Sequence, residues 1–151
     1  MLQRIQTVYL LLVLVCTLVG LCTPLGYFHQ SGFVVADFYN LRLTSAEGLH
    51  DYTPWALFVL LVLVAVSAFC CIFMYKHRMA QVRLAVLGGL LLVGYYLVFG
   101  YFLYSFIHEL NAEFTVSWTL SLPLVAVILE YLAFRGIMKD ELLVRSLNRL
   151  R

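Results

Sequence analysis

The stretch Trp55-Ala-Leu-Phe-Val-Leu-Leu-Val-Leu-Val-Ala-Val-Ser-Ala-Phe-Cys-Cys-Ile-Phe-Met-Tyr75 is the clearest indication of the fold in this sequence. It contains 21 residues and no charge. A helix rises about 1.5 Å per residue, so about 20 residues cross a hydrocarbon core roughly 30 Å thick. In lipid the backbone amides must be satisfied within the segment, which a helix achieves. We therefore predict a transmembrane helix over residues 55–75.

Three further blocks of the chain have the same character. Residues 8–27, 84–107 and 114–134 contain 20, 24 and 21 residues, almost without charge. The composition agrees, because 64% of the 151 residues are hydrophobic and only 12% are charged. In soluble domains about 45–50% of the residues are apolar and about 25% are charged. A chain of this length is enough for one domain. We therefore predict an all-α membrane protein, a single domain of four transmembrane helices.

The basic residues lie on one side of this predicted bundle. Only Arg42 falls on the other side. Lysines and arginines in short flanking segments stay in the cytoplasm, so we predict that both termini are cytoplasmic. The same bias explains the net charge of +2, and no basic and aromatic surface suited to nucleic acid is visible. The nine residues on the predicted cytoplasmic side are Arg4, Lys76, Arg78, Arg83, Arg135, Lys139, Arg145, Arg149 and Arg151.

The connection between the first two blocks, residues 28–54, is the largest segment outside the predicted helices. Its residues 33–43 are rich in β-forming side chains and predict a strand or a short hairpin. A hairpin of this length is marginally stable alone, so we expect it to lie on the helix ends. We expect residues 108–113, on the same side, to form a tight turn before the fourth helix.

The third block carries two patterns at helical spacing. Ala85 and Gly89 form a small-xxx-small pair, which lets another helix approach closely. Further along, four aromatic rings share one helical face. This face indicates packing within the bundle, or a groove for a lipid, a quinone or a partner helix. The four residues are Tyr95, Phe99, Phe102 and Phe106.

Residues 135–151 form a basic tail with leucines at helical spacing. Leu143, Leu147 and Leu150 share one face, and Glu141 can pair with Arg145 four residues later. This pattern predicts a short amphipathic helix that either lies on the inner membrane surface or docks on a partner. The candidate contact residues are Lys139, Arg145, Leu147, Arg149, Leu150 and Arg151.

Glu130 is the one acidic residue inside a predicted span. Ionisable residues within membranes are expensive to bury and are candidates for function. Glu130 lies only five residues before Arg135, so we place it near the inner edge. It is expected to form an ion pair with Arg135, Arg83 or Arg4, to reach toward headgroup water, or to serve as a proton or ion site.

The remaining reactive side chains form no recognisable catalytic or metal motif. The four histidines lie in connections or at helix ends, and the four cysteines lie in the first two apolar blocks with no CxxC spacing. No phosphate-binding glycine loop and no HExxH motif is present. We therefore expect a protein that is not an enzyme and has no cofactor or metal.

Both ends of the chain carry distinctive motifs. The chain starts with Met1-Leu-Gln-Arg-Ile-Gln-Thr-Val-Tyr-Leu-Leu-Leu12 and ends with Ile137-Met-Lys-Asp-Glu-Leu-Leu-Val-Arg-Ser-Leu-Asn-Arg-Leu-Arg151. These two segments resemble the ends of a family of small four-helix membrane proteins of the Bacteroidota, which is catalogued as a domain of unknown function. The resemblance implies an inner-membrane location in a Gram-negative cell and brings no catalytic residues. The plan is also similar to claudin-like and tetraspanin-like proteins. This chain lacks their loop cysteines, so only the architecture is shared.

Two functions are favoured by these patterns over a third, a redox or metal protein built on His29, His50 and His108. The first is a non-enzymatic subunit or scaffold of a membrane complex, which would bind another membrane protein through the aromatic face of the third helix and a cytoplasmic protein through the tail. The second is a small transporter or a lipid- or quinone-binding protein that uses Glu130. We favour the first, because the predicted bundle has almost no polar interior.

Overall fold

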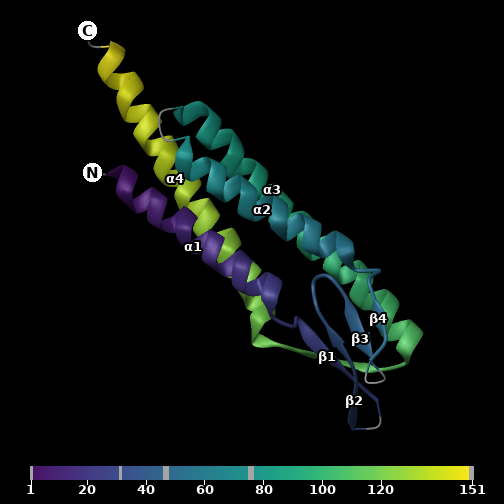
Figure 1. The fold of residues 1–151 in the computed structure, drawn as a ribbon. Helices are drawn as coiled ribbons and strands as arrows, with labels where there is room; N and C mark the ends of the chain where they lie inside the picture. The colour runs from purple at the N-terminus through teal and green to yellow at the C-terminus, as the bar shows by residue number, and fades with distance from the viewer. Residues whose placement is uncertain (1, 31, 46–47, 75–76, 150–151) are drawn as a thin grey trace.

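The computed structural model describes residues 2–30, 32–45, 48–74 and 77–149. Four helices in this part of the chain are long and apolar enough to cross a membrane: α1 (Leu2–Cys22), α2 (Trp55–Phe73), α3 (Arg78–Leu110) and α4 (Ser121–Arg149). They form one elongated bundle in which α1 lies beside α4 and α2 beside α3 (Figure 1). The start of α1 and the end of α4 lie at one end of the bundle, and a small sheet lies at the other (Figure 1).

The sheet has five antiparallel strands in the order β4-β3-β2-β1-β5. Four strands come from the connection between α1 and α2, so the predicted strand or hairpin is confirmed and is part of a larger unit. The fifth comes from the connection between α3 and α4 and pairs with β1. The strands are β1 (Gly26–Gln30), β2 (Phe33–Phe38), β3 (Leu43–Ser45), β4 (His50–Asp51) and β5 (Glu113–Val116).

The connection after α3 differs from the predicted tight turn. The helix continues to Leu110, and Asn111 then adopts a left-handed conformation with φ 46°. Asparagine tolerates this conformation at a helix C-terminus. The chain then runs through β5 and a short 3-10 helix, η1 (Trp118–Leu120), before α4 begins. The predicted turn is wrong because this segment completes the sheet.

Two predicted spans differ from the helices at the end near the sheet. The first was expected to reach residue 27, but α1 ends at Cys22, and the fourth was expected to begin at residue 114, but α4 begins at Ser121. The misassigned residues lie in the connection after α1, at the start of β1, in β5 and in the segment through η1. One of them, Phe114, is apolar because its ring packs against protein, 5.1 Å from that of Phe28. Hydropathy alone does not distinguish such residues from residues that face lipid.

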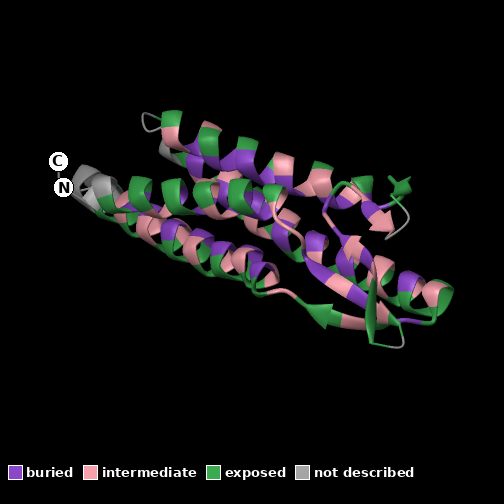
Figure 2. Cartoon of the chain, turned by 60° about the horizontal axis from the view of Figure 1, so that its bottom comes forward, coloured by how far each residue is buried: buried purple, intermediate pink, exposed green. Residues whose placement is uncertain are grey.

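Helix α3 is long enough to support the sheet. Its 33 residues extend over about 50 Å, against a hydrocarbon core of roughly 30 Å. The part nearer Leu110 packs against the sheet: the Phe99 ring stacks 5.8 Å from that of Phe38, and the Phe106 ring lies 6.3 Å from that of Phe28. Buried residues accordingly continue from the inward faces of the helices into the sheet (Figure 2).

The C-terminal segment continues α4, so the prediction of a separate short helix is wrong. No break occurs up to Arg149. The helix is held against α1, because Gln6 Nε2 donates a hydrogen bond of 2.7 Å to Asp140 Oδ2 and the Gln6 side chain lies close to Gly136. The described part of the chain does not include the side chains of Arg145, Leu147 and Arg149, or any atom of Leu150 and Arg151. The predicted amphipathic stripe of the tail therefore lies largely outside the described residues.

Candidate functional site

Glu130 is the most unusual polar residue in the bundle. Its side chain is 2% exposed, and neither carboxyl oxygen has a hydrogen-bond partner in the described part of the chain. It lies five residues before Arg135 on α4, and that helix continues without a break to Arg149. Its predicted place near the inner edge of the membrane stays a prediction. An ionised group buried in hydrocarbon needs a partner or a proton.

The ion pair predicted for Glu130 does not form with Arg135 or Arg83. The Arg135 guanidinium lies over the Tyr131 ring, 6.0 Å from its centroid, and Arg83 is exposed. The third candidate, Arg4, has a side chain outside the described residues. The carboxyl group therefore has no cation beside it among the side chains that the structure describes.

Gly88 on α3 provides the space that the carboxyl group of Glu130 occupies. A Cβ atom at Gly88 would overlap the carboxyl group. The predicted small pair, Ala85 and Gly89, has a different role: Ala85 is buried in the core, whereas a Cβ atom at Gly89 would meet no heavy atom within 4 Å. The close approach of α3 and α4 therefore occurs one residue from the predicted position, and Gly89 faces open space.

A hollow of about 220 Å³ lies between α3 and α4 at this level. Gly89 and Glu130 both line it, while the unpaired carboxyl oxygens of Glu130 are themselves buried, against Gly88. Apolar and aromatic side chains complete the walls. The lining residues are Ala85, Val86, Gly89, Val127, Glu130, Tyr131 and Phe134.

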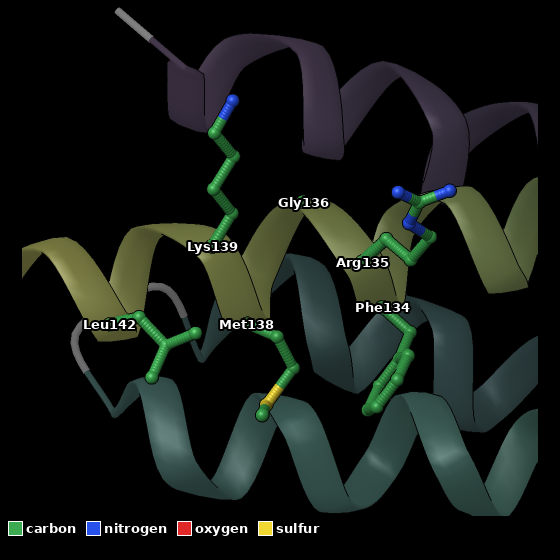
Figure 3. Close-up of a pocket in the computed structure, with 6 residues that line it drawn as sticks. All are labelled: Phe134, Arg135, Gly136, Met138, Lys139 and Leu142. Carbon is green, nitrogen blue, oxygen red and sulfur yellow. The ribbon is translucent and has the colours of Figure 1, made fainter.

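A second hollow, of about 470 Å³, lies further along α4 toward its C-terminal end. Figure 3 shows that Phe134, Met138 and Leu142 point toward one side of α4, and Arg135 and Lys139 toward the other, where α1 lies. Phe134 borders both hollows. Of the predicted contact residues in the tail, Lys139 is the one whose side chain the structure describes, and it is exposed.

Tyr131 is a functional candidate that sequence reasoning did not identify. Its side chain is 56% exposed, and its hydroxyl group has no hydrogen bond within the described residues. It lies within the candidate span Trp118–Val144, directly after Glu130. Its position beside that acid was the available signal. Glu130 and Tyr131 thus place a hydrogen-bond acceptor, the carboxylate, and a hydrogen-bond donor, the hydroxyl group, at neighbouring positions of α4.

The aromatic face of α3 is not an open groove. Tyr95, Phe99 and Phe106 are buried, and Phe102 is half-buried. The sheet covers the rings of Phe99 and Phe106, and the Tyr95 hydroxyl donates a hydrogen bond of 2.8 Å to Asn40 Oδ1. The interpretation of this face as a binding surface for a lipid, a quinone or a partner helix is therefore wrong.

The histidines and cysteines do not gather into a metal site in the described residues. His29 Nδ1 lies 3.2 Å from Thr115 Oγ1 across the β1–β5 pair. The Cys71 thiol contacts the Gln81 carbonyl oxygen at 3.5 Å, and Gln81 Nε2 donates to the Cys71 carbonyl oxygen at 3.2 Å. These contacts join α2 to α3 and indicate structural roles.

The four apolar helices and the unpaired carboxyl group between them indicate a membrane protein with an open face between α3 and α4. The chain belongs to the family described as Domain of unknown function (DUF4293), which matches residues 2–150. The resemblance seen at the two ends of the sequence is confirmed at the level of the family, and the bacterial group that it implies stays a prediction. The comparison with curated proteins found no match.

Proposed function

We propose that this protein is a non-enzymatic subunit or scaffold of a membrane complex, and that the hollow between α3 and α4 receives a transmembrane helix of a partner. The observation that carries this proposal is the open surface at Gly89, in a hollow that is also lined by Glu130, whose buried carboxyl group has no hydrogen-bond partner among the described residues. Helices in membranes associate through small residues that allow close approach and through hydrogen bonds between polar side chains. The hollow offers the small residues, and Glu130 lies in its wall with its carboxyl oxygens buried.

The size of the hollow favours a helix over a small lipophilic ligand. Pockets for small molecules have volumes of about 300–1,000 Å³, and this hollow has about 220 Å³. The hollow is therefore smaller than a typical small-molecule pocket, and one side chain of a neighbouring helix fits in it. The alternative, a transporter or lipid- or quinone-binding protein that uses Glu130, therefore has less support.

We also propose that the protein lies in the inner membrane, with the sheet outside and both termini in the cytoplasm. The nine-to-one distribution of basic residues supports this orientation. The arrangement in Figure 1 agrees with it, because the start of α1 and the end of α4 lie at the end opposite the sheet.

Purification from the native membrane in a mild detergent tests the proposed function. The wild-type chain should run in a complex larger than one chain with its detergent. Gly89→Leu, which fills the hollow, should release a smaller species, while the matched control Gly94→Leu should behave as wild type, since Gly94 also faces open space on α3 but does not line the hollow. A wild-type chain that runs as a lone monomer would refute the proposal.

A further inference from the structure

We propose that the edge of the hydrocarbon core at the sheet end of the bundle lies at the level of Trp55 and Trp118, and that both indole rings bind the headgroup layer of the lipid there. The part of α3 beyond this level then stands outside the hydrocarbon, together with the sheet. Because the partner is lipid, this surface depends neither on the proposed complex nor on which side of the membrane the sheet faces.

Trp118 lies at the level where α1 ends. The hydroxyl group of its neighbour Thr119 donates a hydrogen bond to the carbonyl oxygen of Pro24, shortly after α1. The Tyr96 hydroxyl group on α3 donates a hydrogen bond of 2.9 Å to the carbonyl oxygen of Leu120. These two contacts place η1, which begins with Trp118, beside Tyr96 and the end of α1.

Trp55 reaches the same level from α2. Helix α2 runs antiparallel to α3, and Gln81 Nε2 donates a hydrogen bond of 3.2 Å to the Cys71 carbonyl oxygen. Trp55 precedes Cys71 by as many residues as Leu97 follows Gln81, and both helices rise about 1.5 Å per residue. Trp55 therefore lies close to the level of Leu97, next to Tyr96. Figure 1 agrees, because α3 continues past the start of α2 toward the sheet.

The length of α2 matches a hydrocarbon core that ends at this level. Its 19 residues extend over about 28 Å, and the core is roughly 30 Å thick. The helix carries no charge, and the basic residues Lys76 and Arg78 follow its other end in the sequence. Trp55 thus marks one edge of a charge-free segment of membrane length, and the basic residues mark the other.

The outer part of α3 owes its apolar character to the sheet. Hydropathy alone extends the α3 span to Leu110, about 20 Å beyond the level of Trp55. In this outer part Phe99 and Phe106 are buried, and both rings pack against that of Phe38 on β2. Contact with the sheet therefore accounts for these apolar residues without lipid around them.

The exposed surface of α3 changes at the same level. The large exposed apolar side chains of residues 86–97 are aliphatic, and the next two along the helix are Tyr101 and Tyr104. Trp55 and Trp118 are themselves 60% and 73% exposed. Tryptophan and tyrosine concentrate at membrane–water interfaces, because their rings are apolar and their N–H and O–H groups need polar partners. These side chains therefore fit the headgroup layer.

The chain contains two tryptophans, so Trp55→Phe and Trp118→Phe each leave a single indole ring at this level. Each purified variant is reconstituted into phosphatidylcholine vesicles whose lipids carry bromine either near the headgroup or deep in the acyl chains. Bromine quenches tryptophan fluorescence at close range, and acrylamide in the aqueous phase quenches rings that water reaches. Both variants should be quenched more by the shallow bromine than by the deep bromine, and partly by acrylamide.

A matched pair of positions tests the outer part of α3. In a background with both Trp55→Phe and Trp118→Phe, Leu90→Trp and Tyr104→Trp each place one ring at an exposed position, on nearly the same face of the helix. Leu90→Trp should be quenched more by the deep bromine and little by acrylamide. Tyr104→Trp should be quenched strongly by acrylamide and least of the four proteins by the deep bromine. Circular dichroism and thermal unfolding check that each variant is folded.

Two results would overturn the inference. If the deep bromine quenches Tyr104→Trp as strongly as Leu90→Trp, hydrocarbon covers the whole of α3. If Trp55 or Trp118 is quenched more by the deep bromine, or is reached by neither quencher, the ring lies in the hydrocarbon or under protein instead of in the headgroup layer. The size of the complex in the native membrane enters none of these measurements, so the proposed function is tested separately.

Discussion

The hydroxyl group of Tyr95 donates a hydrogen bond of 2.8 Å to Asn40 Oδ1, which joins the middle of α3 to the loop after β2. Asn40 is fully buried, and its Nδ2 donates a second hydrogen bond of 2.7 Å to the carbonyl oxygen of Gly20. That carbonyl is one of the last four of α1, which have no partner within a helix. One loop side chain therefore connects the sheet to two helices.

Asn40→Ala should destabilise the whole protein. The substitution leaves the Tyr95 hydroxyl and the Gly20 carbonyl oxygen buried without their partner, and each unsatisfied group costs about 1–3 kcal/mol. We expect a decrease of about 2 kcal/mol or more in the free energy of unfolding, measured by denaturation in detergent. Tyr95→Phe should cost less, and the double variant should cost less than the sum, because both changes remove the same bond. Equal stability of Asn40→Ala and wild type would contradict this role.

Gly88→Ala should be far more harmful than a change of one methyl group suggests. The new Cβ atom overlaps the Glu130 carboxyl group, so α3 and α4 must separate or the carboxyl group must move. Overpacking of this kind costs about 1–3 kcal/mol. The control Gly94→Ala should be neutral or stabilising, since alanine has a higher helix propensity than glycine and the space there is open.

The measurement is thermal unfolding of both variants in the same detergent. Combining Gly88→Ala with Glu130→Ala removes the overlapping group and should recover part of the lost stability. A Gly88→Ala protein as stable as Gly94→Ala would show that the carboxyl group of Glu130 does not occupy this space.

The membrane part of the fold was predictable because lipid imposes one simple rule. A long uncharged stretch such as residues 55–75 must be helical, and α2 begins at Trp55 as the sequence indicates. Strand β5 was not predictable, because Phe114 is as apolar as a residue that faces lipid. The strand forms by pairing with β1, more than 80 residues earlier in the chain, and local patterns carry no information on that pairing.

The candidate site was predictable only in part. Glu130 is identified by its charge within an apolar span, but its lack of a partner among the described residues depends on the rotation of α4 about its axis. The same rotation decides that Gly88, and not Gly89, meets the carboxyl group. Tyr131 has no charge and no motif, so its exposed position becomes significant only when the hollow beside it is known.

Gly136→Leu should detach the start of α1 from α4. A Cβ atom at Gly136 would lie 3.0 Å from Gln6 Cγ, so a leucine side chain displaces Gln6 and breaks its hydrogen bond to Asp140. We expect faster hydrogen–deuterium exchange in the first two turns of α1, with little change in α2. Gly100→Leu, at an exposed glycine of α3 with open space around it, serves as control. Unchanged exchange in α1 would show that Gln6 does not hold the helix.

The orientation of the bundle can be tested with single cysteines at its two ends. Leu49 is exposed at the end that carries the sheet, and Val144 is exposed near the end of α4. In a Cys22→Ser background, which removes the exposed native cysteine, a membrane-impermeant maleimide added to spheroplasts should label Leu49→Cys but not Val144→Cys. Permeabilised cells should label both, which shows that each thiol is reactive.

Because the basic residues flanking the spans lie nine to one on the Val144 side, retention of cations in the cytoplasm predicts this result. Labelling of Val144→Cys alone would reverse the orientation, and labelling of both in intact spheroplasts would contradict two ends separated by the membrane.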